Sequence, residues 1–147
     1  MNHFDMDDER NIIMAMYTKG ILIHVNNEYE CAELLKVFAR HGLDYYYSDR
    51  LGNSLSAEDA KNFKKSICYG IITHPIKTNC VKRFNQTDFH NDFKYVVEFN
   101  IIYRQINPND KQLSTDDYSV FTLTAREFWH IIRSEYGETN YKGSNWK

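Results

Sequence analysis

Residues 20–48 read GILIHVNNEYECAELLKVFARHGLDYYYS, and this stretch decides the fold. It opens with an apolar, β-branched run at 21–25, which predicts a strand. Asn27 then offers a helix N-cap, with Glu30 three residues later in the manner of a capping box. Apolar residues follow at helical spacing, and Gly42 supplies a left-handed stop. The stretch therefore predicts a strand–helix–strand unit whose second strand runs through three consecutive tyrosines to its end.

The flanking sequence predicts several shorter elements. Residues 5–18 place acidic side chains before an apolar run, which favours a helix with acid in its first turn, although a strand at 12–17 is an alternative. Thr124 and Glu127 form a second capping-box pattern, which predicts the start of a last helix. Between these ends, the pattern predicts a helix at 56–65, strands at 66–73, 79–84, 94–103 and 118–123, and a polar loop at 104–117.

The order of these elements predicts an α+β fold with a mixed, largely antiparallel sheet and helices packed on one face. A chain of 147 residues is in the size range of a single domain, so we assign residues 1–147 to one domain. Residues 1–19 would be an N-terminal extension or first helix. Residues 137–147 have no apolar face, which predicts a flexible tail.

Composition narrows the class of protein. A net charge of −2 argues against a protein whose whole surface binds nucleic acid. The 3 cysteines are an odd number at irregular spacings, which favours reduced thiols over a disulfide framework. Because the sequence has neither a secretory signal pattern nor a long apolar stretch, we expect a cytoplasmic protein with no membrane partner.

The sequence lacks a glycine-rich phosphate loop, a dinucleotide-binding fingerprint, a Gly-x-Ser-x-Gly elbow and a Cys-x-x-Cys pair, so we expect no cofactor. The best metal candidate is the alternating set Asp88, His90 and Asp92, because oxygen and imidazole ligands at this spacing would share one face of a strand. The same residues are equally typical of a polar turn, which is the interpretation that we favour.

Two other patterns bear on catalysis. Asp92 and Lys94 fit half of a nuclease site, in which an acid holds a metal ion and a lysine positions water. Such a site also needs a second acid on a neighbouring strand, whereas Glu98 is on the same strand. Such three-residue matches arise easily by chance, so we expect no catalytic residues. His24 lies within an apolar strand, which favours a buried and hydrogen-bonded histidine over a general base.

Basic residues are concentrated in the middle of the chain. With Tyr69 and Phe84 beside them, they could form a face for phosphate or nucleic-acid contacts. We favour the simpler interpretation of a solvated helix flank and a basic loop, because acidic residues elsewhere offset the charge. The basic residues are Lys61, Lys64, Lys65, Lys77, Lys82 and Arg83.

The strand tyrosines form the strongest candidate for a partner-binding surface. Successive side chains of a strand point to opposite faces, so Tyr45, Tyr46 and Tyr47 would supply a ring to each face. Tyrosine is enriched at protein interfaces. Together with Asp49 and Arg50, these residues are our predicted partner-binding site, with tyrosines at the edge of the core as the alternative.

Several short segments carry a resemblance to a known group of proteins. They are Val25-Asn26-Asn27, Glu28, Glu30, Leu34-Leu35, Gly42, Ser48, Cys68-Tyr69-Gly70 and the strand 94–99. In these segments, over about residues 20–103, the chain resembles small accessory proteins of bacteriophages, a largely uncharacterised group. The resemblance implies a protein without a catalytic motif that antagonises host defence by binding. We therefore expect a non-enzymatic phage or mobile-element protein that binds and inhibits a host protein, such as a CRISPR effector, and that contacts nucleic acid, if at all, through that target. The alternatives are a sponge for a nucleotide signal and a small metal-dependent nuclease, and the oligomeric state stays open.

Overall fold

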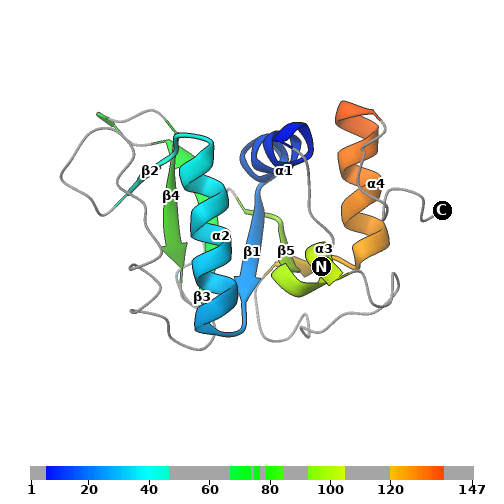
Figure 1. Cartoon of the computed structure of the whole chain (residues 1–147). Helices are drawn as coiled ribbons and strands as arrows, with labels where there is room; N and C mark the ends of the chain where they lie inside the picture. The colour runs from blue at the N-terminus through cyan, green and yellow to red at the C-terminus, as the bar shows by residue number, and fades with distance from the viewer. Residues whose placement is uncertain are drawn as a thin grey trace.

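The structure is a computed structural model, and it describes residues 6–46, 67–73, 75–76, 79–84, 93–104 and 120–137. In this part of the chain, four helices lie against a six-stranded sheet (Figure 1). The helices are α1 (Met6–Lys19), α2 (Glu28–Arg40), α3 (Phe99–Arg104) and α4 (Ala125–Tyr136). The strands are β1 (Ile21–Val25), β2 (Asp44–Tyr45), β3 (Ile67–Thr73), β4 (Asn79–Phe84), β5 (Tyr95–Glu98) and β6 (Phe121–Thr122).

The sheet has the order β2-β4-β3-β1-β5-β6 and is mostly parallel. The pairs β1–β5, β5–β6 and β2–β4 are parallel, whereas β3 pairs antiparallel with both β1 and β4. Only β3 among these strands therefore runs against the others. The expected largely antiparallel sheet is wrong, and the described chain is a single α/β domain. The reason lies in the connections, because helices α2 and α3 follow β1 and β5 and return the chain to strands of the same direction.

Strand β1 lies in the interior of the sheet and is buried along its whole length. Its uninterrupted apolar run is typical of a strand that is covered on both faces. Its central position also places its residues opposite two neighbours at once. His24 lies opposite Cys68 of β3 on one side and opposite Glu98 of β5 on the other.

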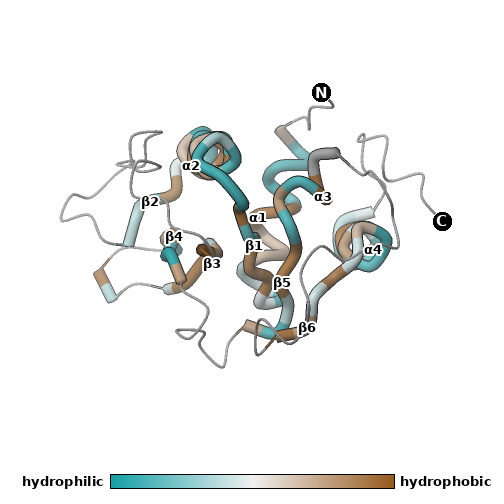
Figure 2. Tube along the Cα trace, turned by 90° about the horizontal axis from the view of Figure 1, so that it is seen from below, coloured by the Kyte–Doolittle hydropathy of each residue, from teal (hydrophilic) through white to brown (hydrophobic). Residues whose placement is uncertain are grey.

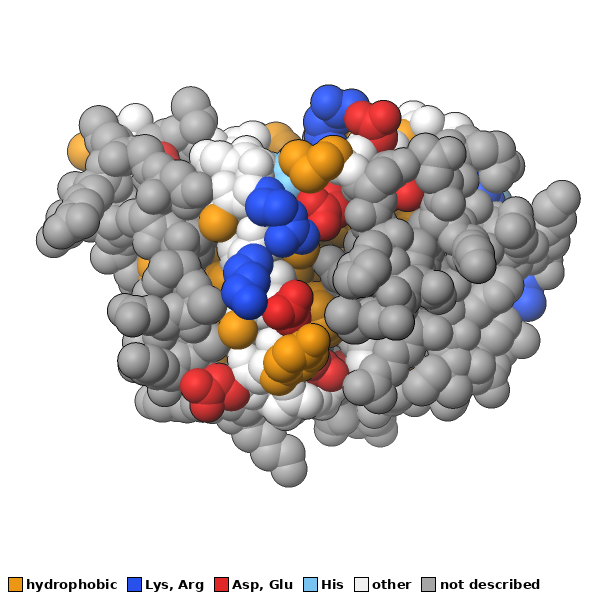
Figure 3. All heavy atoms as spheres, viewed as in Figure 1, with side chains coloured by type: hydrophobic (Ala, Val, Ile, Leu, Met, Phe, Trp, Pro, Cys, Tyr) orange, Lys and Arg blue, Asp and Glu red, His pale blue; other side chains and the backbone are white. Residues whose placement is uncertain are grey.

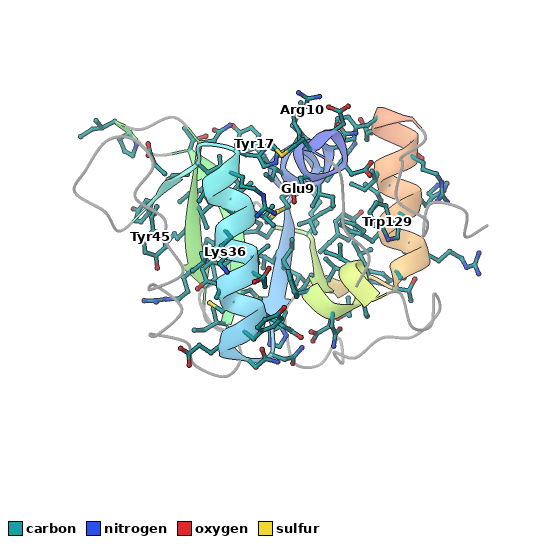
Figure 4. All side chains as sticks on the ribbon, viewed as in Figure 1. Glu9, Arg10, Tyr17, Lys36, Tyr45 and Trp129 are labelled. Atoms are coloured by element: carbon teal, nitrogen blue, oxygen red, sulfur yellow. The ribbon has the colours of Figure 1, made fainter. Side chains whose placement is uncertain are left out.

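One face of the sheet carries the main hydrophobic core. Ile21 and Ile23 of β1 belong to it, and all four described helices contribute side chains. Viewed along the strands, α2, α3 and α4 lie on the same side of the sheet (Figure 2). From α4, the fully buried Trp129 points into this core (Figure 4). Burial of these amphipathic helix faces against the sheet is the main contribution to stability that the structure shows.

The opposite face, which we call the second face, carries a smaller cluster. Its members are apolar residues that alternate with those of the main core along each strand. Gly70 of β3 belongs to this face and leaves room for the ring of Phe93, because a Cβ atom at Gly70 would lie 2.7 Å from it. The cluster consists of Leu22, Cys68, Phe84, Phe93, Val96 and Val120.

Most predicted elements are confirmed, with one clear exception. The helix over 5–18 is correct, and its strand alternative is wrong. The predicted strand over 94–103 is wrong in its second half, since β5 ends at Glu98 and the chain continues as α3. Short apolar runs cannot distinguish strand from helix by periodicity. Here Ile101 and Ile102 reach the main core from helical backbone.

Both predicted helix starts are confirmed by their caps. The Asn27 side chain accepts a hydrogen bond from Glu30 N, and Thr124 and Glu127 form a reciprocal capping box. The strand predicted after Gly42 is shorter than expected, because β2 has only two residues. The predictions for 56–65, 104–117 and 137–147 fall wholly or in part outside the described residues. In the described part, no helix has the length and hydropathy needed to cross a membrane.

Candidate functional site

A polar row crosses the second face where β1 and β5 end. His24 Nδ1 lies 2.9 Å from Glu98 Oε1, and both side chains are buried, at 5% and 1% exposure. The Asn26 amide donates a second hydrogen bond to Glu98 Oε2. The prediction of a buried, hydrogen-bonded histidine is therefore confirmed. Its partner was missed because the two residues lie 74 positions apart in the chain.

The position of this row is the usual place for a site in an α/β fold. After β1 the chain goes through α2 to β2 at one edge of the sheet, and after β5 it goes to β6 at the other edge. Ligands of open α/β sheets bind beyond the carboxyl ends of two such strands. Asn26 lies at this point. Its side-chain amide donates a hydrogen bond to Glu98 Oε2, and its backbone N–H donates one to Glu30 Oε1 at 3.0 Å.

The pairing of β1 with β3 places a thiol next to His24 in this row. Cys68 lies opposite His24 on the adjacent strand, so thiol, imidazole and carboxylate follow one another across three strands. This is the order of a nucleophile, its base and the group that orients the base. Cys68 has no exposed surface, however. The row is therefore an interior polar network in this arrangement, and a substrate cannot reach the thiol.

The predicted metal and nuclease residues are not brought together by the described structure. Asp88, His90 and Asp92 lie outside the described residues. Lys94 is exposed, and Glu98 is committed to His24 and Asn26. Within the described ranges, no group of three His, Cys, Asp or Glu side chains could hold a metal ion. Our predictions of a polar turn and of no catalytic residues therefore stay untested.

The structure describes two of the three consecutive tyrosines. Tyr45, which Figure 4 labels beside β2, is 9% exposed and belongs to the main core. Tyr46 is half-buried, with Lys82 Nζ 4.7 Å from the centre of its ring. Tyr47, together with Asp49 and Arg50, lies outside the described residues. A partner-binding role for this set stays a prediction.

The two described residues of the predicted basic face do not lie on one face of the sheet. Lys82 and Arg83 are neighbours in this strand, so their side chains point to opposite faces of the sheet. Lys82 lies on the second face, with its Nζ 5.3 Å from the ring centre of Phe84. Lys61, Lys64, Lys65 and Lys77 lie outside the described residues.

A surface that the sequence did not indicate lies on the outside of the first two helices. On α1, two methionines and a tyrosine are 43–53% exposed, and on α2 Tyr29 is 62% exposed. Charged side chains alternate with them, as Figure 3 shows for the face that includes α2. We did not predict this surface, although the sequence contains its pattern. Its residues recur along each helix at spacings of three and four, which place side chains on one side of a helix. We define the α1–α2 surface as Met6, Arg10, Met14 and Tyr17 of α1 and Tyr29, Glu33, Lys36 and Arg40 of α2.

Ion pairs hold the two helices of this surface together. The buried Glu9 carboxylate of α1 lies 2.6 Å from Arg40 Nη2 and 3.0 Å from His41 Nε2. Figure 4 shows Glu9 at the junction, with Arg10 and Tyr17 on α1 and Lys36 on α2. A partly buried ion pair is screened less by salt than an exposed one. Glu9 therefore links α1 to the C-terminal end of α2.

Comparison of the chain with protein-family models, characterised proteins and solved structures finds no match. The resemblance to bacteriophage accessory proteins consequently stays a prediction. The function has to be argued from the surfaces described above.

Proposed function

We propose that this chain is a non-enzymatic binding protein, encoded by a phage or mobile element, that captures a host protein and inhibits it. The observation that carries the proposal is the α1–α2 surface. Methionine, tyrosine and arginine are enriched at protein interfaces, and these residue types are exposed there on two helices that are linked by the Glu9–Arg40 ion pair.

The charges of this surface indicate what kind of partner fits it. Arg10 is paired with Asp7 at 2.6 Å, and Lys36 with Glu33 at 3.3 Å. Because these charges are largely compensated within each helix, long-range attraction to a strongly charged partner contributes little. Recognition would rest on the exposed methionine and tyrosine side chains, inserted into apolar pockets of a folded protein. Flexible methionine side chains adapt well to such pockets.

The other two expected functions have less support at the residues that we predicted for them. A nucleotide sponge would use Lys82 and Arg83 together, but these point to opposite faces of β4. A nuclease would need Asp92, which lies outside the described residues. Cys68, which lies opposite His24 in the buried row, has no exposed surface.

The test is capture of a partner by surface variants. The tagged chain is expressed in a bacterial host with known defence systems, co-purifying proteins are identified, and the activity of each is measured with and without the chain. We expect Met14→Ala and Tyr29→Ala each to weaken binding about tenfold, the cost of losing one interface anchor. Ile76→Ala is the matched control, since Ile76 is an apolar side chain that is 80% exposed and belongs to neither α1 nor α2.

The outcomes separate the alternatives. Loss of capture by Met14→Ala and Tyr29→Ala but not by Ile76→Ala, with an inhibited target, supports the proposal. Loss of capture by Tyr46→Ala alone would move the interface to the predicted tyrosine site. A chain that captures no host protein at all, although it is folded, would contradict the proposal.

A further inference from the structure

A groove of about 720 Å³ runs along α4 beside β5 and β6. Its size is within the range of small-molecule sites, which measure about 300–1,000 Å³. It lies on a different part of the molecule from the α1–α2 surface, at the edge of the sheet that β6 forms in the described residues. None of our sequence-based predictions pointed to it.

The floor of the groove is apolar and aromatic. Tyr95 and Phe121 lie opposite each other on β5 and β6, with their rings edge to face and their centroids 6.4 Å apart. Leu123 and Ile131 complete the floor. Phe121 is 45% exposed, which leaves an aromatic surface open toward the groove. A flat ring packs well against such a floor, because aromatic rings prefer offset and edge-to-face contacts.

The rim of the groove is cationic. Arg126, His130 and Arg133 line it from α4 at positions i, i+4 and i+7, which share one side of a helix. Glu127 is the one acid among the described lining residues. Its carboxylate accepts a hydrogen bond from Thr124 N at 2.9 Å in the capping box, so it is directed toward the start of the helix. The guanidinium groups of Arg126 and Arg133, which stay protonated, thus line the same groove as the aromatic floor.

We propose that this groove binds a small organic anion that carries its charge on a flat, apolar ring system. The ring lies on Tyr95 and Phe121. The anionic group accepts hydrogen bonds from Arg126 and Arg133, whose planar guanidinium groups suit carboxylate and phosphate oxygens. This inference does not depend on the proposed capture of a host protein, because it concerns different residues and a different kind of ligand.

The probe is 1-anilinonaphthalene-8-sulfonate, an aromatic anion, titrated into the full-length folded chain while its fluorescence is measured. N-phenyl-1-naphthylamine has the same ring system without the charge and is the matched neutral probe. We expect saturable one-to-one binding of the anion, weakened by added salt, and clearly weaker binding of the neutral probe. The midpoint of urea unfolding must not decrease when the anion is added, so that preferential binding to partly unfolded chain is excluded.

The decisive variant is the double substitution Arg126→Gln and Arg133→Gln. We expect it to weaken binding of the anion about tenfold or more, which corresponds to losing at least one charge-assisted hydrogen bond. Binding of the neutral probe should stay the same. Arg10→Gln removes a charge of the same kind on α1, outside the groove, and should leave both affinities unchanged.

Three results would overturn the inference: no saturable binding of the anion, equal affinity for both probes, or the same loss in Arg10→Gln as in the double variant. If binding is confirmed, competition by 1-naphthyl phosphate and 1-naphthoate then determines whether a phosphate or a carboxylate is preferred. Because no host protein is present in these titrations, failure of the capture experiment leaves their result intact.

Discussion

Replacing Gly70 with alanine tests how tightly the second face of the sheet is packed. A Cβ atom at this position would lie 2.7 Å from two ring carbons of Phe93 and 2.8 Å from Leu22 Cδ2. Both distances are shorter than real Cβ contacts, so at least one neighbour has to move. Neither can move freely, since Leu22 is 0% and Phe93 5% exposed. Gly70 is also not among the glycines with positive φ, so alanine adds no backbone strain there.

The expected cost follows from two opposing effects. Overpacking a well-packed interior costs about 1–3 kcal/mol. Replacing glycine with alanine restricts the unfolded chain and returns about 0.4–1 kcal/mol. We therefore expect Gly70→Ala to lower the free energy of unfolding by about 1–2 kcal/mol. For a chain of this size, that corresponds to a decrease in Tm of roughly 2–8 °C.

Urea unfolding followed by circular dichroism measures this loss as a lower transition midpoint at an unchanged m-value. A double variant, Gly70→Ala with Phe93→Leu, provides the control, because the smaller side chain makes room for the added methyl group. Its loss should be less than the sum of the two single losses. A Gly70→Ala protein as stable as the unsubstituted one, or strictly additive losses, would show that Phe93 does not pack on Gly70.

The other predictions concern buried polar groups on the two faces of the sheet. Burial, and then the hydrogen bond with Cys31, raises the pKa of Tyr69 well above its ordinary value of 10.0. The folded chain keeps this proton where the unfolded chain loses it, so the contribution of Tyr69 is complete below about pH 10 and lost above it. Tyr69→Phe should flatten the decrease of stability between pH 9 and 11 in urea unfolding, and an unaltered alkaline slope would refute the assignment. Glu98→Ala should cost about 1–3 kcal/mol, since it removes the carboxylate that hydrogen-bonds with the buried ring of His24. Glu98→Gln keeps an acceptor and should cost less, so equal transition midpoints for the two variants would contradict the hydrogen-bond network.

The sequence predicts local structure well where a single element decides it. The caps at Asn27 and Thr124 depend on residues three positions apart, and both helix starts are confirmed. The change from β5 to α3 could not be predicted in this way. Residues 95–102 are apolar enough for either structure, and the choice depends on packing of Ile101 and Ile102 in the main core.

Strand direction and the candidate sites depend on contacts between distant segments. The β1–α2–β2 unit can be predicted from the sequence, but the reversed direction of β3 cannot. The partner of His24 is set by the β1–β5 register, which no local pattern carries. The groove beside α4 was missed for the same reason. Its aromatic floor comes from two other strands, although the spacing of Arg126, His130 and Arg133 can be recognised in the sequence.

The interior position of β1 also has a consequence for folding during translation. β1 leaves the ribosome early, but its neighbours β3 and β5 are completed only when residues 73 and 98 have been synthesised. Until then the nascent chain carries an apolar strand whose backbone hydrogen-bonding groups are unpaired on both sides, a state that is prone to aggregation. Translation speed and chaperones that cover this segment would therefore govern the yield of the protein more than they would for a fold that begins with a hairpin.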